Sequence, residues 1–226
     1  QVQYEGEVDL DVKVDLIALD LFDTTVENIE DVHDNGSKVI CYLNAGAWEA
    51  WRPDKDQFPD SVIGAKYQHW PGERWLDIRQ LEVLKPILET RLELCKSKGF
   101  DGVDADNLDG YDNPTGFKIS PEDQIRFNRW LAQAAHQRGL GIGLKNNPDQ
   151  AAILLQDFDW ITTENCFKQN WCNQVSSFLQ AGKPVFAIEY RQEGMQLQDF
   201  CDQAAALGVD AILKNQRLDA WLAGCP

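Results

Sequence analysis

Short runs of apolar and β-branched residues recur along the chain, and longer segments with helical spacing separate them. Runs of this kind are typical of strands that are buried on both faces. We predict eight strands from the pattern, at residues 2–4, 14–20, 39–43, 102–106, 141–145, 160–164, 185–189 and 211–214.

Helical patterns occupy most of the intervening segments. The clearest beginning is Ser120-Pro121-Glu122-Asp123, which supplies an N-cap, a proline at the first helical position and acidic residues against the helix dipole. Pro86 interrupts the pattern at 81–98, so we expect a kink or two shorter helices there. The predicted helices cover residues 25–34, 81–98, 121–138, 149–155, 172–180, 197–207 and 218–223.

The alternation of strands and helices indicates a parallel sheet, and eight such strands in one domain favour a closed barrel. We therefore expect an α/β fold, a compact (β/α)8 TIM barrel that forms a single domain over residues 1–226, with some helices missing or shortened. The first connection, residues 5–13, is too short for a full helix. An open doubly wound sheet is the alternative, but no glycine-rich nucleotide motif follows a strand.

The longest gap between a predicted strand and its helix is residues 44–76. Its aromatic residues are Trp48, Trp51, Tyr67, Trp70 and Trp75. A long loop in a compact domain usually has a function, and aromatic rings suit the C–H faces of sugars. The alternative is a loop that packs its aromatic residues as a small core of its own. The sequence is consistent with both interpretations.

The chain contains 21 basic and 37 acidic residues, which gives a formal net charge of −16. Nucleic acid is excluded as a partner class because phosphate recognition needs a basic surface, and no apolar run is long enough for a membrane span. A cationic substrate would be attracted, although acidity that serves only solubility is the alternative. The N-terminus lacks the basic and apolar regions of a signal peptide, so we expect that any such peptide was removed or never present.

Six cysteines, an even number, favour disulfides. Cys166 and Cys172 are close enough in sequence to close a small loop. Together with the sequon Asn35-Gly36-Ser37, the even count predicts a secreted, extracellular protein. Six free thiols in a cytosolic enzyme are the alternative. No CxxC pair is present and histidines number only three, so the sequence does not support a zinc site.

Polar or charged residues end almost every predicted strand. The active site of a (β/α)8 barrel lies at the carboxyl ends of its strands, so this pattern predicts a catalytic mouth. Strands that simply end where polar loops begin are the alternative. The residues at these ends are Asp20, Asp23, Tyr42, Asn44, Asp104, Asp106, Asp109, Lys145, Glu164, Glu189, Tyr190 and Lys214.

The segment after residue 102 places two carboxylates on one face of a strand. Asp104 and Asp106 are two residues apart, so both point into the barrel if one does, with Asp104 a layer deeper. Two carboxylates so close repel each other, and Lys145 on the neighbouring strand is the natural counter-charge. Glu164 lies one strand further round. Its side chain and that of Asp106 can converge on a bound ligand, and their separation would distinguish a retaining from an inverting glycosidase.

Other chemistries fit the sequence less well. Counted from Asp104, a calcium loop would need its glycine and its glutamate where the chain has Asp109 and Thr115. A serine nucleophile elbow, GxSxG, is absent. Cysteine–histidine catalysis needs a histidine at the mouth, whereas His33, His69 and His136 fall in helix or loop regions.

Six stretches, in order along the chain, carry a family resemblance. They are residues 17–24 (IALDLFDT), 39–46 (VICYLNAG), 75–78 (WLDI), 98–111 (KGFDGVDADNLDGY), 143–147 (GLKNN) and 164–166 (ENC). In these stretches the chain resembles glycoside hydrolase family 114, the endo-α-1,4-polygalactosaminidase-like barrels. The stretch around Asp104–Tyr111 is the most specific of the six.

The resemblance implies a secreted glycosidase that cleaves α-1,4-linked galactosamine polymers such as galactosaminogalactan, with no metal and no other cofactor. It implies that the catalytic carboxylates are Asp106 and Glu164, with Asp104 as a less favoured alternative to Asp106. The place of Asp106 at the end of the fourth predicted strand is also similar to that of the nucleophilic aspartate in α-galactosidase-type barrels. By that analogy Asp106 attacks the anomeric carbon and Glu164 is the general acid/base. An inverting scheme, in which the two act as base and acid, stays open.

Deacetylated galactosamine is cationic, which would give the acidity of the chain a role in substrate attraction. Alternatively, Asp20 and Asp23 cap a strand end or form a salt bridge with Lys145 or Lys214. We expect a monomer that binds a poly- or oligosaccharide and neither nucleic acid nor a membrane. A non-catalytic carbohydrate-binding barrel and a hydrolase of another α-linked glycan are the rival functions. The expected substrate-binding residues are Asp20, Asp23, Tyr42, Trp70, Asp104, Asp109, Lys145, Glu189, Tyr190 and Lys214.

Overall fold

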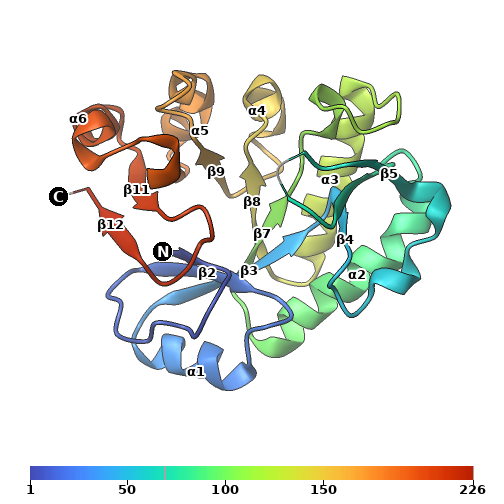
Figure 1. The fold of residues 1–226 in the computed structure, drawn as a ribbon, viewed down its shortest axis with the longest axis horizontal. Helices are drawn as coiled ribbons and strands as arrows, with labels where there is room; N and C mark the ends of the chain where they lie inside the picture. Colours follow the sequence, from blue (N-terminus) through green and yellow to red (C-terminus); the bar gives the residue numbers. More distant parts are fainter. Residues whose placement is uncertain (69, 226) are drawn as a thin grey trace.

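The computed structural model describes residues 1–68 and 70–225. Eight parallel strands follow one another in a single curled sheet, and the antiparallel β12 lies at its last edge (Figure 1). The strand order therefore matches the chain order, as the (β/α)8 prediction requires. The strands are β1 (Val2–Gln3), β2 (Leu16–Asp20), β3 (Lys38–Asn44), β7 (Gly102–Asp106), β8 (Gly141–Lys145), β9 (Trp160–Glu164), β10 (Val185–Tyr190), β11 (Asp210–Lys214) and β12 (Leu222–Gly224).

Helices pack around the outside of the curled sheet (Figure 1). Within the described residues none follows β1 or β11, which confirms a compact barrel with helices missing. The helix at 81–98 runs through Pro86 without a break. None of the described helices is long and apolar enough to cross a membrane. The helices are α1 (Val26–Asp34), α2 (Leu81–Lys98), α3 (Pro121–Gln137), α4 (Pro148–Leu154), α5 (Ser176–Gln180) and α6 (Leu197–Leu207), with short 3-10 turns at Lys55–Gln57, Asp60–Val62, Gly110–Asp112, Cys172–Val175 and Arg191–Glu193.

The helix predicted at 218–223 is wrong. Residues 222–224 instead form β12, which pairs antiparallel with β11. The preceding turn bridges the seam between β11 and β1, because the Leu218 carbonyl accepts a 2.8 Å hydrogen bond from the Tyr4 amide. The Gln1 side-chain amide likewise donates to Ala220. Pairing with distant strands thus overrides the local helical pattern.

The segment 44–76 folds into a small antiparallel sheet of its own, in the order β4 (Ala47–Glu49), β6 (Glu73–Leu76), β5 (Ile63–Lys66). Trp75 is buried and its ring lies 5.0 Å from that of Tyr67, so part of the segment is a small core. Trp51 and Trp70 are exposed. The interpretation as a small core is therefore confirmed for Trp75 and Tyr67, and sugar contact by the exposed Trp51 and Trp70 stays a prediction.

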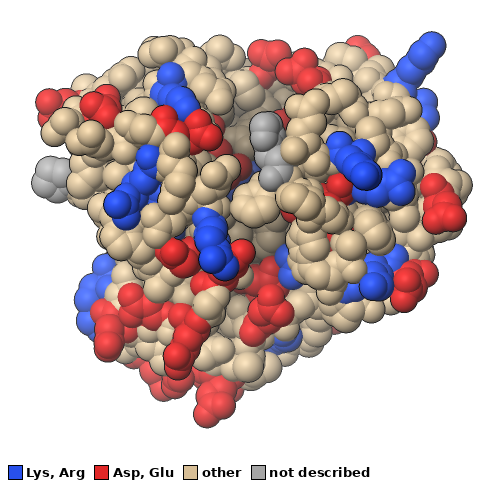
Figure 2. Space-filling view, viewed as in Figure 1, with Lys and Arg blue, Asp and Glu red and all other residues tan. Residues whose placement is uncertain are grey.

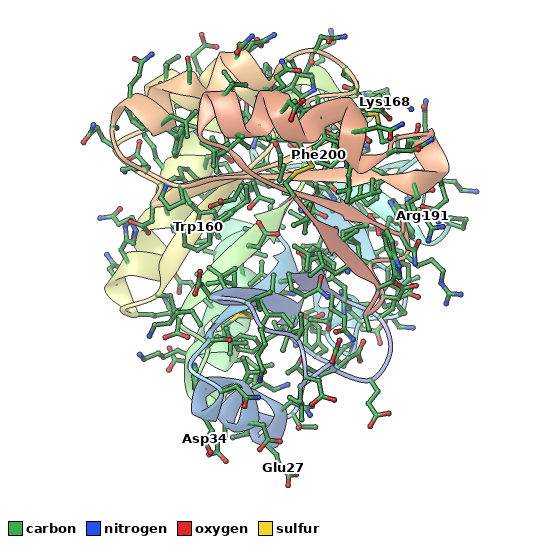
Figure 3. All side chains as sticks on the ribbon, turned by 90° about the vertical axis from the view of Figure 1, so that its left-hand side faces the viewer. Glu27, Asp34, Trp160, Lys168, Arg191 and Phe200 are labelled. Atoms are coloured by element: carbon green, nitrogen blue, oxygen red, sulfur yellow. A yellow bond between two sulfur atoms is a disulfide. The ribbon has the colours of Figure 1, made fainter. Side chains whose placement is uncertain are left out.

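Two apolar clusters hold the fold together. The larger lies between the sheet and the helices, where Phe200 of α6 is directed toward the strands (Figure 3). The smaller fills the barrel interior around Trp160. The indole nitrogen of Trp160 lies 2.1 Å from the position that a Cβ atom on Gly143 would occupy. Only glycine on β8 therefore leaves room for this indole.

All six cysteines form disulfides: Cys41–Cys95, Cys166–Cys172 and Cys201–Cys225. The expected staple between Cys166 and Cys172 is confirmed. Cys41–Cys95 joins β3 to α2, and Cys201–Cys225 ties α6 to the residue after β12. Three disulfides are consistent with an oxidising compartment.

Candidate active site

Asparagines in the left-handed conformation turn the chain at the barrel mouth. Asn107, Asn146 and Asn165 have φ between 53° and 59° and directly follow the last residues of β7, β8 and β9. Asparagine tolerates this conformation better than most residues. Each turn leaves the final strand residue, Asp106, Lys145 or Glu164, at the rim of the mouth.

Lys145 joins the predicted carboxylates. Its ammonium nitrogen lies 3.3 Å from Asp104 Oδ2, 4.0 Å from Asp106 Oδ1 and 3.7 Å from Glu164 Oε2. Because Asp106 Oδ1 and Glu164 Oε2 lie 4.0 and 3.7 Å from one atom, their separation stays below about 8 Å. That range includes the spacings of both retaining and inverting glycosidases. The structure thus confirms Lys145 as the counter-charge of Asp104 and Asp106, and it adds Glu164 of β9 to the same ammonium group.

Glu164 and Asp106, which line the cavity, differ in their hydrogen bonds. Glu164 accepts hydrogen bonds from the hydroxyl of Tyr190 and from the amide of Asn146, the latter at 3.2 Å. Asp106 accepts one at 3.0 Å from the hydroxyl of Tyr42 and one from the amide of the next residue. Asp104, a layer deeper, accepts from Tyr4 at 2.8 Å. The rings of Tyr4 and Tyr42 stack with centroids 3.9 Å apart, so two tyrosines hold two stacked aspartates.

These surroundings separate the acidities of the pair. Burial alone would raise the pKa of Glu164, but Lys145 and the donors from Tyr190 and Asn146 hold that pKa below its usual range. Burial, together with the charges of Glu164 and Asp104, raises the pKa of Asp106 in spite of Lys145. The surroundings therefore make Glu164 the more acidic carboxyl of the two and Asp106 the less acidic.

A cavity of about 500 Å³ opens above the pair and adjoins a second of about 620 Å³. Tyr67, Trp70, Asp109, Glu164 and Tyr190 line both, so the two form one extended cleft. The molecular surface is hollowed near the centre of the face seen in Figure 2. An extended cleft with carboxylates at its floor suits a chain-like ligand that passes over the pair.

The structure places most of the predicted site residues in the first cavity. They are Asp20, Asp23, Tyr42, Trp70, Asp106, Asp109, Lys145, Glu164 and Tyr190. Asp104 lies beneath the cavity floor with 2% exposure, as the strand parity predicts.

Two predicted substrate-binding residues are not brought to the cavity. Glu189 is fully buried and accepts hydrogen bonds from the amides of Phe167 and Lys168. It alternates with Ile188 and Tyr190, which belong to the barrel interior, so its side chain points outward. Lys214 is fully buried and donates to Gln1 and to the Asp219 carbonyl. Both residues secure the scaffold.

The salt bridge expected from Asp20 to Lys145 or Lys214 is wrong. Asp20 pairs with Arg52 at 2.7 Å and caps the strand end by accepting from the amides of Phe22 and Asp23. Arg52 comes from the 44–76 segment and also binds Glu49 at 2.8 Å. Asp23 is exposed at the rim.

Sequence analysis missed several residues of the cavity. Glu49, Arg52 and Glu73 line it, and all three come from the small sheet and its turns. Tyr4, the residue after β1, also lines it. The aromatic residues of the 44–76 segment are the ones that suggest sugar binding in the sequence, whereas Glu49, Arg52 and Glu73 are charged. His33 and His136 lie on α1 and α3, away from the mouth, and His69 lies outside the described residues.

Known proteins share this architecture. The structure is similar to a crystal structure of Aspergillus fumigatus Ega3 in complex with galactosamine, with 38% identity and a TM-score of 0.93 over 99% of this chain and 92% of that chain. It also matches the glycoside hydrolase domain of PelA from Pseudomonas aeruginosa in fold, with 15% identity and a TM-score of 0.77 over 99% of this chain and 96% of that chain. An uncharacterized protein of Deinococcus radiodurans is 24% identical over 216 residues, which cover 84% of this chain and 68% of that protein.

A family model describes the whole of the sequence. The model for glycoside-hydrolase family GH114 matches residues 1–226. The match agrees with the barrel, the cleft and the carboxylates at its floor. The chain is a glycosidase and belongs to glycoside hydrolase family GH114.

Proposed function

We propose that this chain hydrolyses α-1,4-linked galactosamine polymers, with Asp106 and Glu164 as its catalytic carboxylates. The observation that carries the proposal is the convergence of both carboxylates on Lys145 at the floor of an extended cleft. Glycosidic hydrolysis needs one protonated and one ionised carboxyl on opposite sides of the scissile bond. The pKa shifts of the pair run in opposite directions, which favours that combination.

The charge of the cavity supports a cationic substrate. Its lining has eight acidic residues and three basic ones, a formal excess of five negative charges. Each of the three basic residues, Arg52, Lys145 and Arg217, is already in an ion pair with a carboxylate of the protein. A deacetylated galactosamine unit has an ammonium group that such a cavity attracts. The similar Ega3 was crystallised with galactosamine.

The division of roles follows from which carboxyl holds the proton during cleavage. In one retaining scheme Asp106 attacks the anomeric carbon and Glu164 protonates the leaving oxygen. The reverse assignment, in which Asp106 is the acid, agrees with the directions of the two pKa shifts. Azide separates the two schemes, since rescue of a variant that lacks the nucleophile gives a glycosyl azide of inverted configuration.

Loss of either carboxylate tests the catalytic pair. We expect Asp106→Asn and Glu164→Gln each to lower the cleavage of galactosamine oligomers by about 10³-fold or more, with little change in thermal stability. Chain shortening is followed by chromatography or mass spectrometry. Glu30→Gln, an exposed change on α1 with the same loss of charge, is the control and should cleave like wild type.

Two results would contradict the proposal. If wild type leaves deacetylated and acetylated oligomers whole but binds them, the chain is a carbohydrate-binding barrel. If both variants stay active, the catalytic residues lie elsewhere.

We further infer that residues 1–226 form one catalytic domain that acts outside the cell. One curled sheet collects strands from both ends of the chain, and the three disulfides favour an oxidising environment. Mass spectrometry of the protein from culture medium and from cell extract, with and without reductant, tests the second part. Protein found only inside cells with free thiols would contradict it.

A further inference from the structure

Glu73 is a buried carboxylate at the catalytic cavity, and the described residues provide no counter-charge dedicated to it. It begins β6, has 8% exposure and lines the cavity beside Asp106 and Tyr42. Among the described residues, no hydrogen bond or ion pair reaches its carboxylate. A carboxylate that is nine-tenths buried without a partner is costly, so its position needs a reason.

The charged groups near Glu73 include another carboxylate and an arginine that is already paired. It pairs across the small sheet with Glu49, another buried carboxylate. The nearby cation, Arg52, already binds Glu49 at 2.8 Å and Asp20 at 2.7 Å. One guanidinium thus serves two carboxylates and leaves the third unpaired. Burial, followed by the charges of Asp106 and Glu49, raises the pKa of Glu73 to about 8.

An aromatic surface lies next to this carboxylate. Gly72, which has a φ of +99°, precedes Glu73, and the position of a Cβ atom there would be 2.9 Å from the ring of Trp51. The Trp51 ring therefore packs directly over the backbone that carries Glu73. The rest of the ring is exposed in the cavity. A sugar ring stacked on an aromatic face next to a carboxylate is a suitable arrangement for an amino sugar.

We propose that Glu73 binds the ammonium group of the galactosamine unit that lies next to Asp106, and that it thereby selects deacetylated over N-acetylated polymer. The inference deepens the proposed function and rests on it for the identity of the sugar. An ammonium group provides the counter-charge that the Glu73 carboxylate does not receive from the described residues. An acetamido group at the same place offers one neutral donor in place of the ammonium charge, so it binds less well.

Measuring binding in an enzyme that does not cleave its substrate separates the binding role of Glu73 from catalysis. Titration calorimetry compares the Glu164→Gln enzyme with Glu73→Gln/Glu164→Gln, using galactosamine and N-acetylgalactosamine oligomers of equal length. We expect the Glu73 change to weaken binding of the galactosamine oligomer by about 10- to 100-fold, the loss of a buried charge-assisted contact. Binding of the acetylated oligomer should change by less than about twofold. Glu30→Gln/Glu164→Gln, with the same charge change on α1, should bind like its parent.

The outcomes separate this inference from the proposed function. If both oligomers lose affinity equally, or if galactosamine binding is unchanged, Glu73 is not the ammonium partner. If the Glu164→Gln enzyme does not bind galactosamine oligomers, the inference also fails. If those oligomers bind through Glu73 but wild type never cleaves them, the inference stands and the proposed hydrolysis is wrong. Thermal unfolding of Glu73→Gln shows that the variant is folded, since removal of an unpaired buried charge is not expected to lower its stability.

Discussion

Lys145 is the residue on which the acidic floor of the cleft depends. Burial alone would lower the pKa of its ammonium group, but the charges of Asp104, Glu164 and Asp106 raise that pKa above its usual value. The lysine stays charged because three carboxylates surround it, and those carboxylates are tolerated in the interior because of the lysine. Removal of Lys145 would leave three buried carboxylates without their shared counter-charge, which is strongly destabilising.

Glu73 makes the stability of the protein depend on pH. Its pKa is about 8 in the folded chain and near 4.5 in the unfolded one. Between these values the folded state binds the extra proton, so the free energy of unfolding is highest below the unfolded pKa and falls as the pH rises to about 8. We expect a loss on the order of a few kcal/mol between about pH 5 and pH 8.

Urea unfolding at several pH values measures this loss. Glu73→Gln should remove a large part of it and become the more stable protein at pH 8. A parallel decline in wild type and variant would show that other groups, such as Asp109 with its pKa raised to about 7 by burial and by Asp106, carry the dependence instead.

For single residues, the sequence predicts the side-chain positions that follow from alternation along a strand. The depth difference between Asp104 and Asp106 and the pairing with Lys145 follow from alternation on parallel strands. Glu189 shows the limit of the approach, because its place at a strand end suggested the mouth while its parity points it outward. The place of Glu73 at the cavity could not be predicted, because it depends on the pairing of β6 with β4. In that pairing Glu73 lies opposite Glu49, which is 24 residues earlier in the chain.

The asparagine turns after β7, β8 and β9 act at the scale of elements. Asn165 follows Glu164 with a φ of 55°, and its Oδ1 atom has no hydrogen-bond partner among the described residues. We expect Asn165→Gly to keep the stability of wild type, since glycine adopts this conformation freely. Asn165→Ala should cost about 1 kcal/mol and lower activity, because it strains the turn that positions Glu164.

Chemical denaturation of both Asn165 variants measures the difference. Asn173 provides the matched control, because it is exposed in a 3-10 turn with a negative φ. At position 173 the alanine variant should be at least as stable to denaturant as the glycine variant. The same order of alanine and glycine at both sites would contradict the conformational explanation.

Elements with strong local signals were predictable, and those that depend on distant partners were not. The bounds of β7, β8, β9, α2 and α6 agree with the sequence pattern, because buried strands and amphipathic helices carry their signal in each window. The small sheet of 44–76 consists of strands of three or four residues, too short for a pattern. At 218–223 a helical pattern gave way to β12, which β11 and the Cys201–Cys225 bond hold in place.

Over the whole molecule, the negative charge is concentrated at one end of the chain. Residues 1–34 contain eleven acidic residues and one basic one. Acidic side chains gather over this segment along the lower edge in Figure 2, and Glu27 and Asp34 on α1 point away from the body of the molecule in Figure 3. Together with the acidic cavity, this distribution produces a negative field that attracts a cationic polymer.

The field predicts a salt dependence of the reaction. Between about 20 and 200 mM NaCl, kcat/KM for galactosamine oligomers should fall several-fold, because salt screens attraction over roughly 10 Å. Initial rates at low substrate concentration give this value directly. The rate for any acetylated oligomer that is cleaved should stay nearly constant, and an equal fall for both would point to an effect of salt on the protein.

The seam of the barrel has a consequence for the order in which the chain folds. β1 pairs with β2, which lies about fifteen residues later in the chain. On its other side it contacts the turn at Leu218, more than two hundred residues later. A chain made from its N-terminus therefore cannot finish the barrel until that turn has emerged. Until then Tyr4, which holds Asp104 under the catalytic pair, lacks its support from Leu218. A contact that cannot form until late in synthesis thus supports the aspartate beneath the catalytic pair.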